Sequence, residues 1–303
     1  MQYQIRRLGV GGILDQTINV VKDNFGLLFT IYAVTLMPFN FLQAYVSASL
    51  TTQIEEIQRN AARPRGVAPN FAGPNMSAVD QMSGGQLAMI FFGVVFLLLL
   101  AYLVFNAATI HGVASLYISR PTSLGDCIKT GFRRFFPMIW TGFLMGLALL
   151  GAVLITVIPG SFVMGFLGFP LPLMLIGMFA LYIPAIVLFM WWILAQEITV
   201  LEHISGSDAL GRSKKLMRGN IGKAFVIFLI LGVINAGLQY GVAPMLASHP
   251  LLFSIVATIV GGATSILGAA ALVVLYFSAR CQHENFDLQM LTSAVAEDAE
   301  SPR

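Results

Sequence analysis

The sequence predicts an all-α integral membrane protein whose six transmembrane helices form three helical hairpins, each preceded by a short cytoplasmic amphipathic helix. Composition is the first observation. Hydrophobic residues make up 57% of the chain, charged residues make up 10%, and the mean hydropathy is +0.81, whereas about a quarter of the residues in soluble domains are charged. The second observation is a series of six long apolar stretches. The third is the gathering of lysine and arginine between alternate stretches, which is typical of cytoplasmic loops.

Each apolar stretch is long enough to cross a bilayer, because a spanning helix needs about 20 mostly apolar residues. The stretches are longer than barrel strands, and backbone groups in hydrocarbon must pair internally, so we expect helices. The first stretch is also too long for the core of a signal peptide and lacks a small-residue cleavage site after it, so we expect it in the mature protein. The expected spans are Phe25–Val46, Leu87–Ile118, Phe136–Ile158, Leu171–Ile198, Ile221–Leu246 and Leu251–Ser278.

Basic residues set the expected orientation. The outer side carries Arg59, Arg63 and Arg65 in one long loop, and the turns at 159–172 and 247–250 contain no lysine or arginine. By the positive-inside rule both termini are cytoplasmic, and we expect the bacterial cytoplasmic membrane as the location. The remaining basic residues belong to the inner side: Arg6, Arg7, Lys22, Arg120, Lys129, Arg133, Arg134, Arg212, Lys214, Lys215, Arg218, Lys223, Arg280 and Arg303.

We expect a subset of these inner residues to anchor the topology in contact with anionic phospholipid headgroups. A phosphate or polyanion site in the stretch 212–225 is the alternative. A net charge of +3 is too small to indicate a nucleic-acid partner. The expected anchors are Lys22, Lys129, Arg133, Arg134, Arg212, Lys214, Lys215, Arg218 and Lys223.

Three cytoplasmic segments share a pattern that indicates an internal repeat. Each has a capping-type residue three positions before an aspartate, in the pairs Gly12 and Asp15, Ser123 and Asp126, and Ser205 and Asp208. This spacing is typical of a helix start, and apolar residues at helical spacing follow it. Chance similarity between amphipathic segments is the alternative. We interpret residues 1–285 as one membrane domain with units at about 12–120, 121–203 and 204–285, followed by a polar tail at 286–303.

The expected connections differ between the units. Residues 51–66 extend the helix of the first span, and residues 67–85 are rich in proline, glycine and asparagine, as in a mobile outer loop or lid. The segment 158–172 is apolar but interrupted by glycine and proline. We interpret it as lying within the membrane edge rather than crossing it, and whether it is re-entrant stays open.

Polar residues inside the spans have two interpretations. Asn40, Gln43, Asn106, Asn235 and Gln239 either form hydrogen bonds between helices or line a transport pathway. Small residues at every fourth position of the sixth span favour close helix contacts. At the inner interface we expect ion pairs that join acidic residues to arginines. Their members are Glu202, Glu284 and Asp287 with Arg212, Arg218 and Arg280.

No catalytic motif, metal-ligand pattern or cofactor fingerprint is present, so we expect no catalytic residue, metal or cofactor. Cys127 and Cys281 lack the spacing of a zinc site or a redox pair. The histidines are scattered along the chain. Glu197 and Glu202 are five residues apart, which places them on different faces of a helix rather than in a carboxylate pair.

Three stretches resemble the bacterial membrane-domain family associated with glycerophosphoryl diester phosphodiesterases and its stand-alone relatives. They read GGILDQTINVVKDNFGLLF, VLEHISGSDALGRSKKLMRGNIGKAF and VLYFSARCQHENFDLQML. The resemblance implies six spans, cytoplasmic amphipathic connectors and mostly no assigned activity. The soluble barrel that carries the chemistry of the phosphodiesterases is absent here. The residues that carry the resemblance are Glu202, Ala209, Leu210, Arg212, Ser213, Leu216, Gly219, Tyr276, Arg280, Glu284, Phe286, Asp287 and Leu288.

Two functional hypotheses follow. The first is a non-catalytic membrane module that acts in envelope or lipid homeostasis or anchors a partner protein. The second is a transporter or lipid-moving protein that uses a cavity between the hairpins. An open, polar-lined cavity that reaches the membrane midplane near Asn40, Asn106 and Asn235 would favour the second hypothesis, whereas a tightly packed interior would favour the first. Phospholipid bound in a groove would favour lipid handling.

Overall fold

The computed structural model describes residues 3, 5–41, 84–166, 168, 170, 173, 177, 180–242, 250–289 and 292. All regular structure in these residues is helical. The expected outer loop at 51–83, the residue Gln43, the turn at 247–249 and most of the tail lie outside the described residues. The helices are α1 (Val10–Asp23), α2 (Phe25–Thr35), α5 (Gly84–Tyr117), α6 (Leu124–Phe166), α8 (Ile183–Trp192), α9 (Ala195–Leu201), α10 (Ser207–Met217), α11 (Ile221–Val242) and α12 (Pro250–Glu284).

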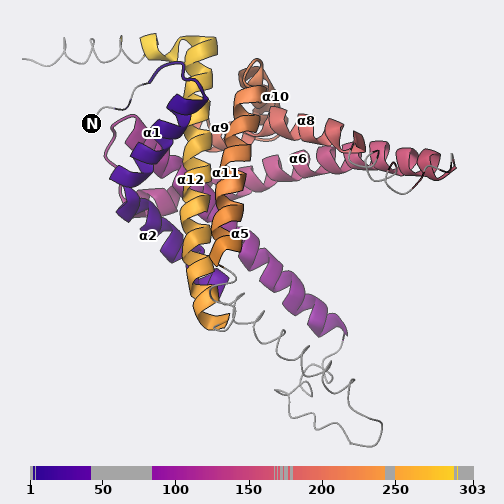
Figure 1. Ribbon diagram of the computed structural model, residues 1–303. Helices are drawn as coiled ribbons and strands as arrows, with labels where there is room; N and C mark the ends of the chain where they lie inside the picture. Colours follow the sequence, from indigo (N-terminus) through magenta and orange to yellow (C-terminus); the bar gives the residue numbers. More distant parts are fainter. Residues whose placement is uncertain are drawn as a thin grey trace, which may run out of the picture.

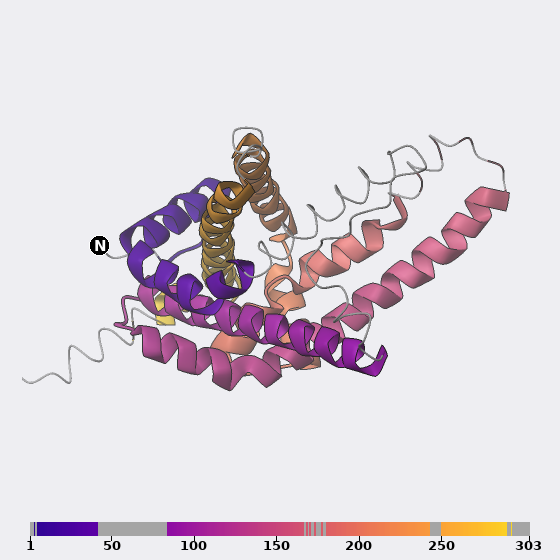
Figure 2. The same cartoon turned by 90° about the horizontal axis from the view of Figure 1, so that it is seen from below.

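The long helices diverge from one end of the molecule, which carries α10 and the C-terminal end of α12 and is called the shared end below (Figure 1). α11 and α12 run side by side, whereas α6 and α8 leave the shared end together in another direction, and α5 runs between them (Figure 1). The view at 90° shows the same separation of the α6–α8 pair from α11 and α12 (Figure 2). The short helices α1, α9 and α10 pack at the shared end.

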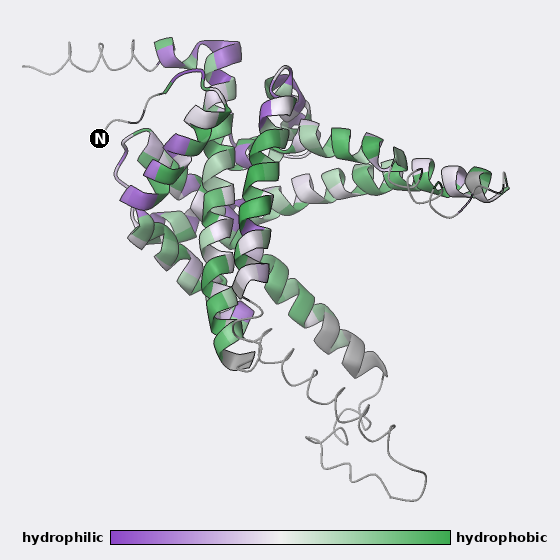
Figure 3. Ribbon diagram, viewed as in Figure 1, coloured by the Kyte–Doolittle hydropathy of each residue, from purple (hydrophilic) through white to green (hydrophobic). Residues whose placement is uncertain are grey.

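Five helical segments among the described residues are long and apolar enough to cross a membrane. Large apolar side chains on the projecting arms are exposed, for example Phe162 at 77% and Phe166 at 85%. Figure 3 shows hydrophobic residues along the arms and hydrophilic residues on α1, on α10 and at the C-terminal end of α12. Since apolar surface in water is unfavourable by about 25 cal/mol per Å², this pattern is that of an α-helical membrane protein. The segments are Phe92–Tyr117, Leu124–Val163, Ile183–Leu201, Ile221–Leu238 and Ile255–Glu284.

The first expected span differs from the prediction. α2 ends at Thr35, a turn follows at Leu36, and helix resumes over residues 37–41, where the described part ends. Pro38 explains the interruption, because its ring has no N–H to donate and clashes with the preceding helical turn. Within the described residues, this segment is therefore an 11-residue helix and a short continuation rather than one continuous span.

The amphipathic connectors are separate helices in two of the three units. α1 precedes α2, and α10 precedes α11, as expected. The prediction for the second unit is wrong, because its connector is continuous with the next span in the 43-residue helix α6. Neither a glycine at positive φ nor a helix-stopping turn interrupts α6 between the two parts, and Pro137 is accommodated inside the helix.

Only one of the three expected caps forms. Ser123 Oγ accepts a hydrogen bond from the Asp126 backbone N–H at 3.2 Å and donates one to the Asp126 carboxylate at 2.6 Å, at the start of α6. α1 begins at Val10, so Gly12 and Asp15 lie inside it. The residue before α10 is Gly206, with no side-chain cap.

Gly206 has a specific role at this position. Its φ of +67° favours glycine, and an added Cβ would lie 2.7 Å from Trp140 Nε1.

The segment after the third expected span is more helical than predicted. α6 continues through Pro159 to Phe166, so the first half of the expected turn at 158–172 belongs to a helix. Thr156 and Ser161 hydroxyls donate to nearby backbone carbonyls of α6. These carbonyls belong to Ala152 and Ile158, so the Ile155 carbonyl, which Pro159 leaves without an N–H donor, is not their acceptor.

The fourth expected span is a broken helix. α8 ends at Trp192 and α9 begins at Ala195, with a turn at Ile193 and Leu194 between them. The break frees carbonyl groups at the end of α8, which need new donors. Buried Ser213 of α10 donates its hydroxyl to the Trp191 carbonyl at 2.8 Å. The connector α10 therefore stabilises the break.

The best-buried core surrounds α12, which contacts α2, α5, α9 and α10. Tyr117 and Tyr276 are almost completely buried at the shared end, and Tyr32 is almost completely buried farther along α12. Tyr32 packs so closely on α12 that a Cβ at Gly262 would lie 2.3 Å from its ring, and its hydroxyl donates to the Thr258 carbonyl at 2.8 Å. This core fixes the base from which the arms diverge.

Candidate functional site: a cavity between the diverging arms

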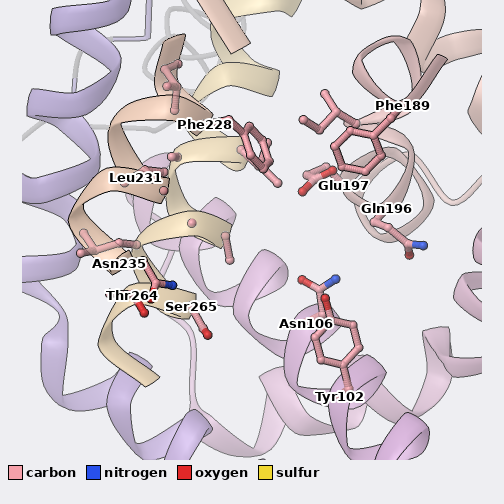
Figure 4. A pocket seen from close by; sticks show the side chains of 18 of the residues that line it. Tyr102, Asn106, Phe189, Gln196, Glu197, Phe228, Leu231, Asn235, Thr264 and Ser265 are labelled. Atoms are coloured by element: carbon pink, nitrogen blue, oxygen red, sulfur yellow. The ribbon is translucent and has the colours of Figure 1, made fainter. Parts of the chain in front are cut away.

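A cavity of about 620 Å³ lies where the α6–α8–α9 arm separates from α5, α11 and α12. Its volume is within the range of small-molecule sites, about 300–1,000 Å³. Residues from all these helices contribute to its wall (Figure 4). The break between α8 and α9 falls at this wall, since Trp192, Ile193 and Gln196 all line the cavity.

The wall is mainly apolar. Phe189 of α8 and Phe228 of α11 meet edge to face across the divergence, with ring centroids 6.2 Å apart. Three glycines of the wall, Gly146, Gly232 and Gly268, would place an added Cβ in open space, with nothing within 4 Å. The glycines therefore widen the cavity between the helices.

A small number of polar side chains interrupt the apolar wall. Thr264 and Ser265 donate their hydroxyls to carbonyls of their own helix, at 3.1 and 2.8 Å. The polar members with amide, carboxylate or aliphatic hydroxyl groups are Asn106, Gln196, Glu197, Asn235, Thr264 and Ser265.

Glu197 is the chemically distinctive member. Its side chain is 2% exposed, and its Oε2 atom has no hydrogen-bond partner in the described part of the protein. Gln196 Oε1, on the neighbouring residue, is likewise buried without a partner there. Polar groups buried in this way are normally satisfied, which makes these two acceptors unusual among the described residues.

The predicted polar cluster is only partly assembled. Asn106 and Asn235 both line the cavity. Asn40 lies elsewhere, where its amide donates to the Tyr32 hydroxyl at 2.9 Å. The side chain of Gln239, like Gln43, is outside the described part.

The expected ion pairs come together at the inner end of α9, α10 and α12. Arg212 Nε lies 2.9 Å from Glu202 Oε2, and Arg212 Nη1 also pairs with Glu284. Arg280 Nε pairs with Glu284 at 3.0 Å, and the Tyr276 hydroxyl donates to Glu202 at 2.9 Å. Burial alone would lower the pKa of Arg212, but hydrogen bonds to both carboxylates outweigh it and raise that pKa. We call Glu202, Arg212, Arg280 and Glu284 the inner ion-pair cluster.

Two residues expected in these pairs take no part in the inner ion-pair cluster. Arg218 and Asp287 form no ion pair with another described residue, although the Arg218 carbonyl lies 3.0 Å from His283 Nε2. Arg218 follows the last residue of α10, and its side chain is exposed. The Arg218 guanidinium is therefore exposed at the end of α10.

Most of the expected lipid anchors are exposed. Lys214 lies over the Trp191 ring, 4.4 Å from its centroid, which is a cation–π geometry. Lys223 donates to the Gln282 side chain at 3.4 Å. Arg134 and Lys223 are half-buried, and Arg212 is held in the inner ion-pair cluster. The exposed anchors are Lys22, Lys129, Arg133, Lys214, Lys215 and Arg218.

Sequence reasoning did not identify Glu197 and Gln196 as site residues. The available signal was a carboxylate inside the expected span Leu171–Ile198, because ionisable residues in spans usually mark functional sites. Glu197 lines the cavity, whereas Glu202 belongs to the inner ion-pair cluster. Among the described residues, no group of three or more histidine, cysteine, aspartate or glutamate side chains is arranged to hold a metal ion.

Comparison with known proteins places the chain in a family. The model of the family described as a domain of unknown function (DUF8558) matches residues 1–298, so the chain belongs to this family. No curated protein and no solved structure matches the chain.

Proposed function

We propose that this DUF8558 family member binds an amphipathic lipid in the cavity between its diverging arms and takes part in lipid handling in the membrane. The observation that carries the proposal is a mainly apolar cavity of about 620 Å³ with a few polar groups, formed between apolar helices. An acyl chain matches the apolar wall, and a polar headgroup matches the few polar side chains. Two of the three asparagines that the sequence-based criterion named, Asn106 and Asn235, line the cavity.

We propose a topology of six spans in three hairpins, with both termini on the cytoplasmic side of the bacterial cell membrane. Five apolar helical segments and the helix that starts at Phe25 support this number. The hydrophilic shared end carries α1, α10 and the C-terminal end of α12, as expected for one cytoplasmic face (Figure 3). Exposed anchors such as Lys215 and Arg218 would contact anionic headgroups there. The relation to the membrane domains of glycerophosphoryl diester phosphodiesterases is part of this proposal.

The test is to fill the cavity without disturbing the fold. Leucine at Gly232 would project into the cavity from α11, where the structure leaves open space. Gly237→Leu is the matched control, because it lies on the same helix, has the same open surroundings and does not line the cavity. Each protein is purified in mild detergent and its bound lipids are measured by native mass spectrometry and lipidomics.

We expect the natural protein and Gly237→Leu to retain lipid, and Gly232→Leu to lose most of it. Equal lipid retention by all three proteins would contradict binding in this cavity. The rigid inner ion-pair cluster at the shared end favours the second candidate, a non-catalytic module that anchors a partner. Absence of bound lipid in the natural protein, together with a copurifying protein, would favour that candidate.

A further inference from the structure

The charge inside the cavity restricts what it can bind. Among the described residues that line it, Glu197 is the only acidic side chain, and there is no lysine, arginine or histidine. A phosphate or carboxylate deep in the cavity would therefore meet a carboxylate and no cation. The wall is electrostatically suited to a positive group.

The geometry also restricts where that positive group would lie. In Figure 4 the Glu197 carboxylate lies beside Phe189, on the side that faces Phe228. Its Oε2 is a buried acceptor without a partner in the described residues, whereas the Gln196 side chain points away from it (Figure 4). A carboxylate in such surroundings is unfavourable unless it is protonated or paired.

We propose that the cavity holds a lipophilic ammonium compound, with its cationic headgroup bound by the Glu197 carboxylate. This inference rests on the proposed function and specifies its ligand class. An ammonium group supplies three donors, one of which would satisfy Glu197 Oε2. Phe189, Trp192 and Phe228 line the same cavity, and aromatic rings favour a nearby cation. The apolar wall then accommodates the hydrocarbon chain.

The test compares two probes with the same chain and different headgroups. Hexadecylamine is cationic at pH 7, because primary amines of this kind have a pKa of about 10, whereas hexadecanol is neutral. Binding of each probe to the purified full-length chain is measured by native mass spectrometry. The variants are Glu197→Gln, which keeps the size of the side chain, and Gly237→Leu as a control outside the cavity.

We expect the natural protein to prefer hexadecylamine over hexadecanol by about tenfold or more, as a charge-assisted hydrogen bond allows. Glu197→Gln should lose this preference while still binding hexadecanol, which also shows that the variant is folded. Gly237→Leu should keep the preference. An unchanged preference in Glu197→Gln would overturn the inference.

Three further outcomes distinguish the possible failures. Equal binding of both probes to the natural protein would overturn the ammonium inference and leave lipid binding intact. Failure of both probes to bind, together with no effect of Gly232→Leu on retained lipid, would overturn the proposed function itself. Stabilisation by Na⁺ that depends on Glu197, without any hexadecylamine binding, would identify an inorganic cation site and would also overturn the inference.

Discussion

Replacing Arg212 by leucine should destabilise the protein through the inner ion-pair cluster. Arg212 contacts Glu202 through two nitrogens, at 2.9 and 3.2 Å, and also pairs with Glu284. These carboxylates are 17% and 23% exposed, so water would solvate them only partly after the change. Arg280 would be left as the one counter-charge within the cluster. The cluster joins α9, α10 and α12, so its loss should loosen the shared end.

The magnitude follows from the degree of burial. Exposed ion pairs contribute about 0–1 kcal/mol, and removal of one partner from a fully buried pair costs about 3–5 kcal/mol. The intermediate burial and the double pairing of Arg212 indicate a loss of about 2–3 kcal/mol in the free energy of unfolding. Glu202→Gln in the Arg212→Leu background should recover part of this loss, because it removes one uncompensated charge.

The assay is thermal unfolding in detergent, followed by the fraction of protein that remains monodisperse on size exclusion. Lys215→Leu is the matched control, since it removes an exposed cation from the same helix. We expect Arg212→Leu to unfold several degrees below the natural protein and Lys215→Leu to unfold close to it. Equal unfolding temperatures for the two variants would refute the structural role of the cluster.

Three other changes test separate parts of the structure. Gly262→Val should lower stability by about 1–3 kcal/mol or more, measured by the same unfolding assay, because an added Cβ would lie 2.3 Å from the Tyr32 ring. Ser213→Ala should cost about 1–3 kcal/mol by leaving the Trp191 carbonyl without its 2.8 Å donor; a natural unfolding temperature would contradict this role. Replacing the exposed anchors Lys214, Lys215 and Arg218 by glutamine should reduce the fraction of protein whose α10 loop stays on the cytoplasmic side, measured with reporter fusions. Unchanged topology and unchanged lipid binding would count against the anchor role.

Hydropathy predicted the helices more reliably than it predicted their ends. Long apolar runs fix where helices form, because backbone groups in hydrocarbon must pair internally. Pro38 and Pro159 show why the ends are harder to predict. The same residue type lies at an interruption after α2 and inside the continuous helix α6. The outcome depends on neighbouring packing rather than on proline alone.

The candidate site was less predictable than the inner ion pairs. Charge alone indicated that Glu202, Glu284 and Asp287 pair with Arg212, Arg218 and Arg280, because opposite charges at one interface tend to pair. Four of these six residues form the inner ion-pair cluster. The break at Ile193 and Leu194 contains neither glycine nor proline. Glu197 Oε2 lacks a hydrogen-bond partner because of the side chains of α5, α6 and α11 that surround it. A single sequence does not show which side chains these are.

A cryo-electron microscopy map of the protein in lipid nanodiscs would test the central claim most directly. The account predicts elongated density between the α8 and α11 arms, with its polar end beside Glu197 and its chain along Phe228 and Leu231. A map in which α6 and α8 pack flush against α11 and α12, with side chains filling the space around Glu197, would contradict it.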